Sequence, residues 1–199
     1  MNLWNFKAKF YSSIRSLPLL KKLVDREIEG LKALVNKNLS DPMEMLDIGT
    51  GTGMVQRIVS ENTCIFGIDK SLKMIEKNVG KNLFIKIVGE ACHLPIKNNT
   101  FSLVSAIGLT EYISDKDLFL QEIKRVLLPE GYFLVTIAPP SPLNKIRNLL
   151  GNRIYAVKAE KWETLTGKKG FICIEQTQSL LQVQYLLRLK KLGVKSYGS

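Results

Sequence analysis

The sequence is poor in the residues that metal sites and disulfide-rich folds need. It has a single histidine, His93, and three cysteines, which are scattered and lack metal-ligand spacing. These cysteines are Cys64, Cys92 and Cys173. We therefore expect neither a metal site nor a disulfide framework, and unpaired cysteines suit a reducing cytoplasm.

Long hydrophobic runs are also absent. A membrane-spanning helix needs roughly 18 to 20 consecutive apolar residues, and no window of the sequence is that long. The first residues lack the charged-then-apolar order of a secretory signal. With 45% hydrophobic and 24% charged residues among 199, we expect a soluble cytoplasmic protein that buries a substantial core.

Acidic residues are few, and they gather in the middle of the chain. The net charge is +11, but residues 41–140 carry 10 basic and 12 acidic side chains, a net of −2. The flanks carry +5 over residues 1–40 and +8 over residues 141–199. The positive charge is therefore not expected to serve the ligand of the central segment.

This central segment alternates short apolar runs with helical patterns. The predicted strands span 45–48, 64–69, 83–88, 101–107 and 131–137. Helices are predicted after the first, second and fourth strands, the first through Val55, Ile58 and Val59 and the last over 116–127. Apolar strands that alternate with helices predict an α/β fold, namely a three-layer, Rossmann-like, doubly wound and mostly parallel sheet with helices on both faces. Ligands of such sheets bind at the carboxyl ends of the strands.

The flanking segments are predicted to complete a single domain. Apolar residues recur at three- and four-residue spacings over 12–38, which indicates a helix. Residues 143–166 fit a helical or irregular cover and 170–175 a strand, whereas 180–192 fit a strand or a helix equally. The predicted parts of the domain 1–199 are an N-terminal helical lid (1–40), a cofactor-binding core (43–137) and a substrate-side cover with the last strands (138–199).

The first predicted strand runs into the glycine-rich turn Asp47-Ile48-Gly49-Thr50-Gly51-Thr52-Gly53. Glycine lets the backbone turn tightly and approach a ligand at the positive end of the next helix. Asp69 lies 20 residues after Gly49, at the end of the next strand, where a carboxylate can accept both hydroxyls of a ribose. The third glycine of a dinucleotide site would fall at position 54, which is Met54, so the spacing disfavours a dinucleotide.

Three carboxylates are expected at the same edge of the sheet. Asp47, Asp69 and Glu90 each stand at or just after the end of a predicted strand. A carboxylate beside the glycine turn would repel a pyrophosphate but would pair with an ammonium group. An acidic pocket in a basic protein therefore favours a ligand with positive charge and a ribose, and S-adenosylmethionine has both.

At this point the sequence resembles the class I S-adenosylmethionine-dependent methyltransferases, in the branch of quinone-biosynthesis and small-molecule enzymes. Five stretches within about residues 43–137 carry the resemblance, in the right order and spacing. They are residues 46–53, 67–71, 89–96, 99–104 and 122–132.

The resemblance implies a role for each matching position. The glycine turn would hold the methionine part of the cofactor and Asp47 its amino group, while Asp69 would hold the ribose. Glu90 would lie near the adenine amino group, beside the backbone of Ala91. The full set that the resemblance assigns to the cofactor is Asp47, Gly49, Thr50, Gly51, Gly53, Asp69, Lys70, Glu90, Ala91, Ile107, Gly108 and an N-terminal aromatic, Tyr11 with Phe10 as the alternative.

Methyl transfer asks little chemistry of the protein. The sulfonium is already an activated donor, so positioning and the exclusion of water dominate, and a base helps only when the acceptor must lose a proton. Glu111, which follows the fourth predicted strand, is the candidate base. By the resemblance, many relatives have histidine or another polar group at this position. The acceptor is expected to be a small or lipid-like molecule.

Several alternatives remain open from the sequence alone. The basic flanks also fit a methyltransferase of RNA or DNA, although no nucleic-acid-binding module is recognisable. A non-catalytic cofactor-binding protein of the same fold is a third hypothesis, and Met54 with Asp47 disfavours a nicotinamide-dependent oxidoreductase. Residues 4–15 combine aromatic and basic side chains, which fits either a lid helix or contact with an anionic membrane.

Overall fold

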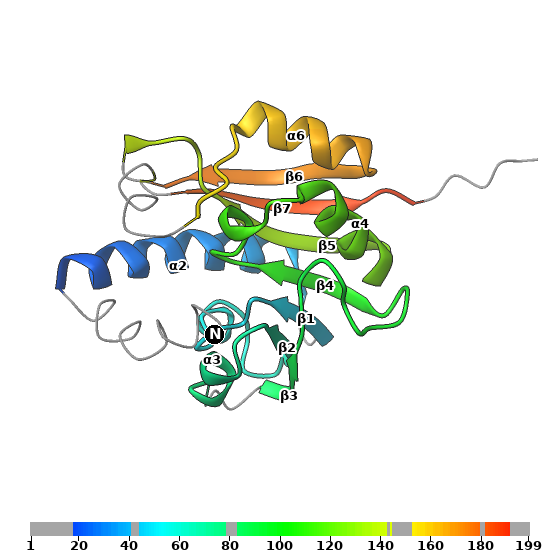
Figure 1. Ribbon diagram of the computed structural model, residues 1–199, viewed down its shortest axis with the longest axis horizontal. Coiled ribbons are helices and arrows are strands. Elements are labelled where there is room, and N and C mark those ends of the chain that lie inside the picture. The colour runs from blue at the N-terminus through cyan, green and yellow to red at the C-terminus, as the bar shows by residue number, and fades with distance from the viewer. Residues whose placement is uncertain are drawn as a thin grey trace, which may run out of the picture.

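The computed structural model describes residues 18–40, 44–78, 83–142, 144, 153–179 and 182–191, and Figure 1 gives their arrangement. The predicted cofactor contact Tyr11 and the aromatic and basic stretch 4–15 lie outside the described residues. None of the described helices is long and apolar enough to span a membrane.

A seven-stranded sheet runs through the middle of the molecule in the order β3-β2-β1-β4-β5-β7-β6 (Figure 1). The strands are β1 (Glu44–Ile48), β2 (Cys64–Asp69), β3 (Leu83–Val88), β4 (Phe101–Ala106), β5 (Leu127–Ile137), β6 (Phe171–Gln178) and β7 (Val183–Leu189). Strands β1 to β5 pair in parallel, and β7 is antiparallel to both β5 and β6. The predicted mostly parallel, doubly wound sheet is confirmed.

The strand order reverses beside β1, and this reversal places the ligand site. Chain order runs outward through β2 and β3 on one side of β1 and through β4 and β5 on the other. The connections that leave the carboxyl ends of β1 and β4 therefore diverge to opposite faces and open a crevice between them. The glycine turn follows β1 at this point.

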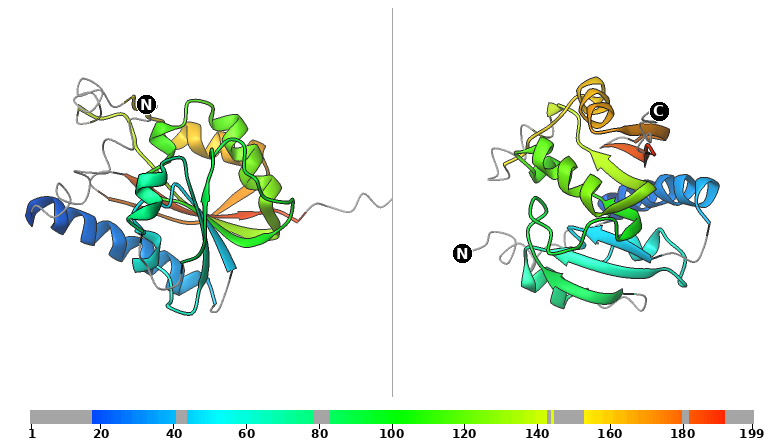
Figure 2. Two further views of the ribbon diagram at one scale, coloured as in Figure 1. Left: turned by 60° about the horizontal axis from the view of Figure 1, so that its bottom comes forward. Right: turned by 90° about the vertical axis from the view of Figure 1, so that its right-hand side faces the viewer.

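Helices cover both faces of the sheet, which completes the three layers (Figure 2). Helix α2 (Pro18–Asn38) buries Ile28, Leu31, Leu34 and Val35 in a core cluster with side chains of β1, β2, β4, β5 and β7. Helices α4 (Lys116–Val126) and α6 (Ala159–Lys168) bury the other face in a second cluster. The strands between them read as continuous apolar runs because both of their faces are buried.

Helix α4 illustrates how local sequence sets an element. Asp115 caps its first turn by accepting a hydrogen bond from the Leu118 amide at 2.9 Å. Phe119, Leu120, Ile123 and Val126 recur at helical spacing and are fully buried. The predicted helix over 116–127 is therefore confirmed to within one residue.

Two elements differ from the prediction, and a third settles whether residues 180–192 contain a strand or a helix. The helix predicted through Val55, Ile58 and Val59 is only a 3-10 turn, η1 (Val55–Arg57). Its apolar side chains are buried without a regular helix, because so short a segment after a glycine turn is held by packing and not by its own hydrogen bonds. Strand β5 begins at Leu127, directly after α4 and before the predicted 131, and residues 183–189 form a strand.

Candidate functional site

A cavity opens at the carboxyl ends of the first strands, where the strand order reverses. Its walls come from the turns after β1, β2, β3 and β4. The lining residues are Ile48, Gly49, Gly51, Ile68, Asp69, Lys70, Met74, Gly89, Glu90, Ala91, Ile107, Gly108, Leu109, Tyr112 and Ile113. The structure thus brings eight of the predicted cofactor residues into one cavity: Gly49, Gly51, Asp69, Lys70, Glu90, Ala91, Ile107 and Gly108.

The glycine turn has the left-handed backbone that its sequence requires. Gly49, Gly51 and Gly53 have φ values of +71°, +51° and +93°, a region that other residues enter only with strain. The Gly49 and Thr50 amides both donate to the carbonyl oxygen of Ile68, at 2.7 and 3.0 Å. The turn is therefore fastened to the end of β2 through the backbone.

Asp69 fastens the same turn through its side chain. One carboxylate oxygen, Oδ2, accepts from the Gly51 amide at 2.9 Å, and the other, Oδ1, accepts from the Ser71 amide at 2.8 Å. Burial raises the pKa of Asp69 above its ordinary value, and these two hydrogen bonds oppose that rise. The carboxylate is held rigidly at the cavity, and each oxygen keeps a further lone pair for a ligand hydroxyl.

Asp47, the carboxylate at the end of β1, is buried behind the cavity. Ser105 on β4 donates its hydroxyl to Asp47 Oδ1 at 2.5 Å, and the Thr50 hydroxyl also hydrogen-bonds the carboxylate. Burial raises the pKa of Asp47 to about 6, against the effect of these two hydrogen bonds. Of the predicted cofactor residues that the structure describes, Asp47, Thr50 and Gly53 do not line the cavity.

Glu90 and Ala91 form the rim of the cavity after β3. Glu90 is exposed and Ala91 is buried, and the His93 amide donates to the Glu90 carbonyl oxygen at 3.1 Å in a tight turn. The Gly89 amide donates to the Asp69 carbonyl oxygen at 3.1 Å, which ties this rim to β2. The Glu90 carboxylate thereby adds to the negative potential of Asp69 at one edge of the cavity.

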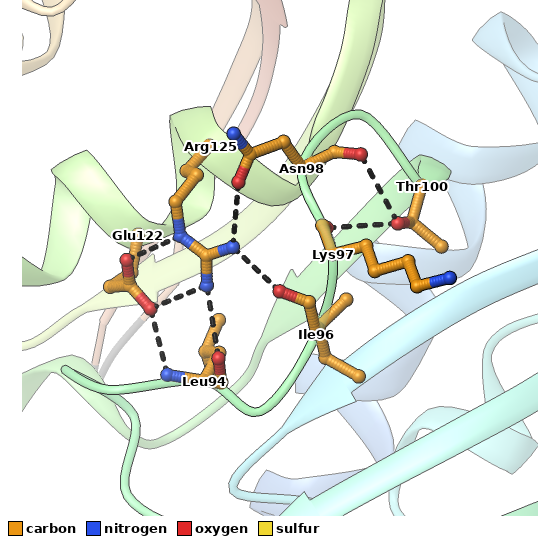
Figure 3. A network of polar contacts seen from close by, with 7 residues as sticks. All are labelled: Leu94, Ile96, Lys97, Asn98, Thr100, Glu122 and Arg125. Carbon is orange, nitrogen blue, oxygen red and sulfur yellow. Dashed lines mark hydrogen bonds and ion pairs between the residues drawn. The ribbon is translucent and has the colours of Figure 1, made fainter.

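A polar network on α4 anchors the loop that continues this rim (Figure 3). The Arg125 guanidinium donates to the carbonyl oxygens of Leu94 and Ile96 and pairs with Glu122 at 2.7 Å. Glu122 in turn accepts from the Leu94 amide at 2.7 Å. This pairing lowers the pKa of Glu122 and raises that of Arg125, so both groups stay charged near neutral pH.

The opposite side of the cavity follows β4 and is more apolar. We call it the β4 wall, meaning Ile107, Gly108, Leu109, Tyr112 and Ile113. Gly108 has φ +66°, and its amide donates to the Thr136 hydroxyl oxygen at 2.8 Å. A side chain added at Gly108 would meet nothing within 4 Å, so this glycine faces open space where a ligand can approach the backbone.

Glu111 lies within the 3-10 turn η2 (Thr110–Tyr112), which supports the β4 wall. It is 8% exposed and does not line the cavity, whereas its neighbours Tyr112 and Ile113 do. Its carbonyl oxygen accepts from the Tyr155 amide at 2.7 Å, and Lys116 Nζ donates to the carbonyl oxygens of Ile113 and Tyr155. Burial lowers the pKa of Lys116, and the nearby Glu111 carboxylate opposes that shift.

Sequence reasoning missed much of the β4 wall and the support beneath the turn. Leu109, Tyr112, Ile113 and Met74 line the cavity although no motif marks them. Ser105, which bonds Asp47, carries no spacing signal either. Only their position after a strand end offered a clue, because the carboxyl ends of parallel strands share one edge of the sheet.

The residues that line the cavity fit S-adenosylmethionine in shape and charge. The turn presents its backbone through glycines, and a Cβ at Gly51 would point toward Asp69 Oδ2, 4.0 Å away. The only charged groups that line the cavity among the described residues are Asp69, Glu90 and Lys70. An acidic edge and an apolar wall suit a cationic nucleoside better than a pyrophosphate.

Comparisons with known proteins agree with this geometry. Residues 46–135 match the family model described as "Methyltransferase domain". The chain is 32% identical over 153 residues to an uncharacterized protein of Methanocaldococcus jannaschii, covering 76% of this chain and 57% of that protein. It is 31% identical over 135 residues to the demethylmenaquinone methyltransferase of Thermotoga maritima, covering 64% and 56%.

A solved structure supports the same fold. It is an S-adenosylmethionine-dependent methyltransferase of Thermotoga maritima, which superposes with a TM-score of 0.73 at 20% identity and covers 94% of this chain and 100% of that chain. The chain spans a little over half the length of the two curated relatives that it matches. The sheet order and the superposition give this chain the fold of the class I S-adenosylmethionine-dependent methyltransferases, and residues 46–135 match a methyltransferase domain.

Proposed function

We propose that this chain transfers the methyl group of S-adenosylmethionine to a small or lipid-like acceptor. The observation that carries the proposal is Asp69, whose carboxylate is held by the Gly51 and Ser71 amides at the edge of the cavity. A carboxylate fixed in this way is prepared to accept the two hydroxyls of a ribose without further ordering. The Thermotoga maritima relative is named a methyltransferase, which agrees with methyl transfer, but this chain spans only 56% of its length.

The described residues divide the cofactor between them. The Gly49–Gly51 backbone would carry the methionine part, with Asp47 beneath it providing negative potential for the amino group. Asp69 would hold the ribose, and Glu90 with the Ala91 backbone would meet the adenine edge. When bound, the sulfonium supplies an activated methyl group that is displaced in line.

The β4 wall is the side from which an acceptor would approach. Leu109, Tyr112 and Ile113 present apolar or aromatic surface there, which suits an acceptor with a hydrophobic body. Glu111 lies directly behind this wall, and it remains the candidate base for an acceptor that loses a proton. The name of the Thermotoga maritima relative, a demethylmenaquinone methyltransferase, is consistent with an aromatic lipid of this kind.

The distribution of positive charge favours a small acceptor over a nucleic acid. Lys124, Lys190 and Lys191 line a hollow beside Leu189, at the end of β7. Strand β7 runs antiparallel to β5, so that Val183 lies opposite Ile137 at the carboxyl end of β5 and Arg188 lies opposite Tyr132, further toward its amino end. The hollow beside Leu189 therefore lies at the amino ends of the parallel strands. It is thus at the edge of the sheet opposite the cavity, and this cluster of lysines does not adjoin the site of the methyl donor.

Calorimetry tests the cofactor site directly. S-adenosylmethionine, S-adenosylhomocysteine and NAD would be titrated into the wild-type protein, the Asp69→Ala variant and a matched control, Asp117→Ala. Asp117 is an exposed carboxylate on α4 paired with Lys169, away from the cavity. We expect micromolar binding of the first two ligands, and a loss of about hundredfold in Asp69→Ala, since two hydrogen bonds to a charged group are removed.

The control variant should bind as the wild type does. Binding of NAD alone, or of none of the three ligands, would contradict the proposed function. If the wild type binds, an acceptor screen starting with quinones and small amines, read as S-adenosylhomocysteine formed, would test turnover.

A further inference from the structure

A chain of polar side chains, which we call the turn network, runs beneath the glycine turn, and all of its members are buried except the half-buried Gln56. Its members are Gln56, Asn78, Thr50, Asp47 and Ser105, contributed by η1, the segment just after α3 (Leu72–Glu76), the turn, β1 and β4. Gln56 Nε2 donates to Asn78 Oδ1 at 2.8 Å, and Asn78 Nδ2 donates to Thr50 Oγ1 at 3.2 Å. Thr50 and Ser105 then both hydrogen-bond the Asp47 carboxylate.

Asn78 is the centre of this network and is completely buried. Its amide nitrogen donates to the Ile75 carbonyl oxygen at 3.0 Å, and its own carbonyl oxygen accepts from Lys86 Nζ at 2.6 Å. With the two side-chain bonds to Gln56 and Thr50, all four of its polar groups have partners. A residue bound on every side can hold its neighbours in one arrangement.

The direction of the hydrogen bonds gives Asn78 control over Thr50. Because Asn78 donates to Thr50 Oγ1, the hydroxyl hydrogen of Thr50 is left to point at the Asp47 carboxylate. The same carboxylate receives the Ser105 hydroxyl from the opposite side, at 2.5 Å. Asp47 is therefore held between two donors, and one of them is oriented by Asn78.

The backbone of the turn is fitted to the same side chains. A Cβ added at Gly53 would lie 2.7 Å from both Asn78 Oδ1 and Gln56 Oε1, so the turn packs directly on the network. The Gly53 amide donates to the Thr50 carbonyl oxygen at 2.9 Å. Movement of Asn78 would thus disturb both the side chain and the backbone of the turn.

We propose that Asn78 is a positioning residue, which acts on the cofactor without contacting it. Through Thr50, Asn78 holds the glycine turn and the Asp47 carboxylate in the arrangement that binds S-adenosylmethionine. Asn78 does not line the cavity, and no motif in the sequence marks it. The inference rests on the proposed function, because it deepens the account of that site.

The test compares variants at two points of the network with a control of similar burial elsewhere. Asn78→Ala removes the oriented donor, and Thr50→Val removes the hydroxyl at nearly constant volume. Thr166→Val is the control: Thr166 is a buried threonine on α6 whose hydroxyl donates within its own helix. For each protein, the Kd for S-adenosylmethionine would be measured by calorimetry and the melting temperature by calorimetric unfolding.

We expect Asn78→Ala and Thr50→Val each to weaken cofactor binding by about tenfold, as for the loss of one buried hydrogen bond that orients a charged group. The double variant should be little weaker than either single variant, because both remove the same link. Thr50→Ser, which keeps the hydroxyl, should bind more tightly than Thr50→Val. Thr166→Val should lower the melting temperature without a matching change in Kd.

A second readout separates positioning from general loss of stability. In the protein without ligand, Asn78→Ala should speed amide hydrogen exchange at Gly51 and Gly53 more than at Phe133 and Leu134 in β5, which are fully buried. Wild-type affinity in a folded Asn78→Ala, or fully additive losses in the double variant, would overturn the inference while leaving the proposed function intact. Failure of the wild type itself to bind S-adenosylmethionine would overturn both. If Asn78→Ala does not fold, Thr50→Val against Thr50→Ser gives the same decision.

Discussion

The two sides of the cavity are built in different ways. On the side of β1 and β2, the Gly49 and Thr50 amides bond the Ile68 carbonyl oxygen and the Asp69 carboxylate accepts from backbone amides, at 2.7 to 3.0 Å and between segments no more than 20 residues apart. On the other side, the β4 wall is held by contacts with distant segments, such as the Tyr155 amide on the Glu111 carbonyl oxygen. The difference suggests that the first side is fixed for one cofactor, whereas the second side can vary with the acceptor.

The largest effect that would sharpen this comparison is expected at Glu111. If the acceptor loses a proton during attack, Glu111→Gln should lower kcat by about 10²- to 10⁴-fold, the usual contribution of a general base. The Kd for S-adenosylmethionine should hardly change, because Glu111 lies behind the β4 wall and not in the cavity lining. Single-turnover kinetics with an identified acceptor would measure it, and an unchanged kcat would remove Glu111 from the chemistry.

The next effect concerns Asp47 on the other side of the cavity. Its pKa is raised by burial to about 6, whereas an unfolded chain has the ordinary value of 3.8, so the native state binds more protons between these values. The contribution of Asp47 to the free energy of unfolding is thus greatest below pH 3.8 and is lost as the pH rises through 6. The loss is about 3 kcal/mol at most.

Asp47→Asn should remove this dependence. The free energy of unfolding of the variant minus that of the wild type should therefore increase between pH 4 and 7, measured by urea denaturation at each pH. Taking the difference cancels the carboxylates whose pKa is lowered, such as Glu122 and Glu175. A difference that stays flat with pH would show that Asp47 is not held as a desolvated carboxylate.

A smaller effect is expected from the anchor of the rim, and it would test whether the cofactor side depends on α4. Arg125→Ala removes the donors to Leu94, Ile96 and Glu122 and should lower the free energy of unfolding by about 2 kcal/mol. Arg125→Lys should restore little, because an ammonium group cannot make the planar, forked set of bonds. Urea denaturation measures both, and full stability in Arg125→Lys would contradict the geometric argument.

Much of the cofactor side could be predicted because its requirements are local. A glycine at a positive φ and a carboxylate at a strand end are each visible in a few residues, as at Gly51 and Asp69. Of the β4 wall, only Ile107 and Gly108 were predicted, and the rest could not be predicted in the same way. In the sequence, Tyr112 and Tyr155 are not distinguished from other aromatic residues. Their positions follow from the contact of η2 with residues 153–157.

The prediction for η1 was wrong for a related reason. Val55, Ile58 and Val59 have helical spacing, but burial against α2 and β1 satisfies that spacing in a single 3-10 turn. Conversely, the pattern over 180–192 fits a strand or a helix equally, and pairing between β5 and β6 makes residues 183–189 a strand. Short apolar patterns are decided by the partners that cover them.

The sequence by itself determined the order of the five parallel strands, the glycine turn and the acidic edge of the cavity, because apolar periodicity, glycine conformation and charge are properties of neighbouring residues. Only the tertiary structure decided that Asn78 supports the turn, that Ser105 bonds Asp47 and that η2 forms the opposite wall. These contacts join residues 28 and 58 positions apart. Their energy exists only after the sheet has brought those residues together and excluded water from them.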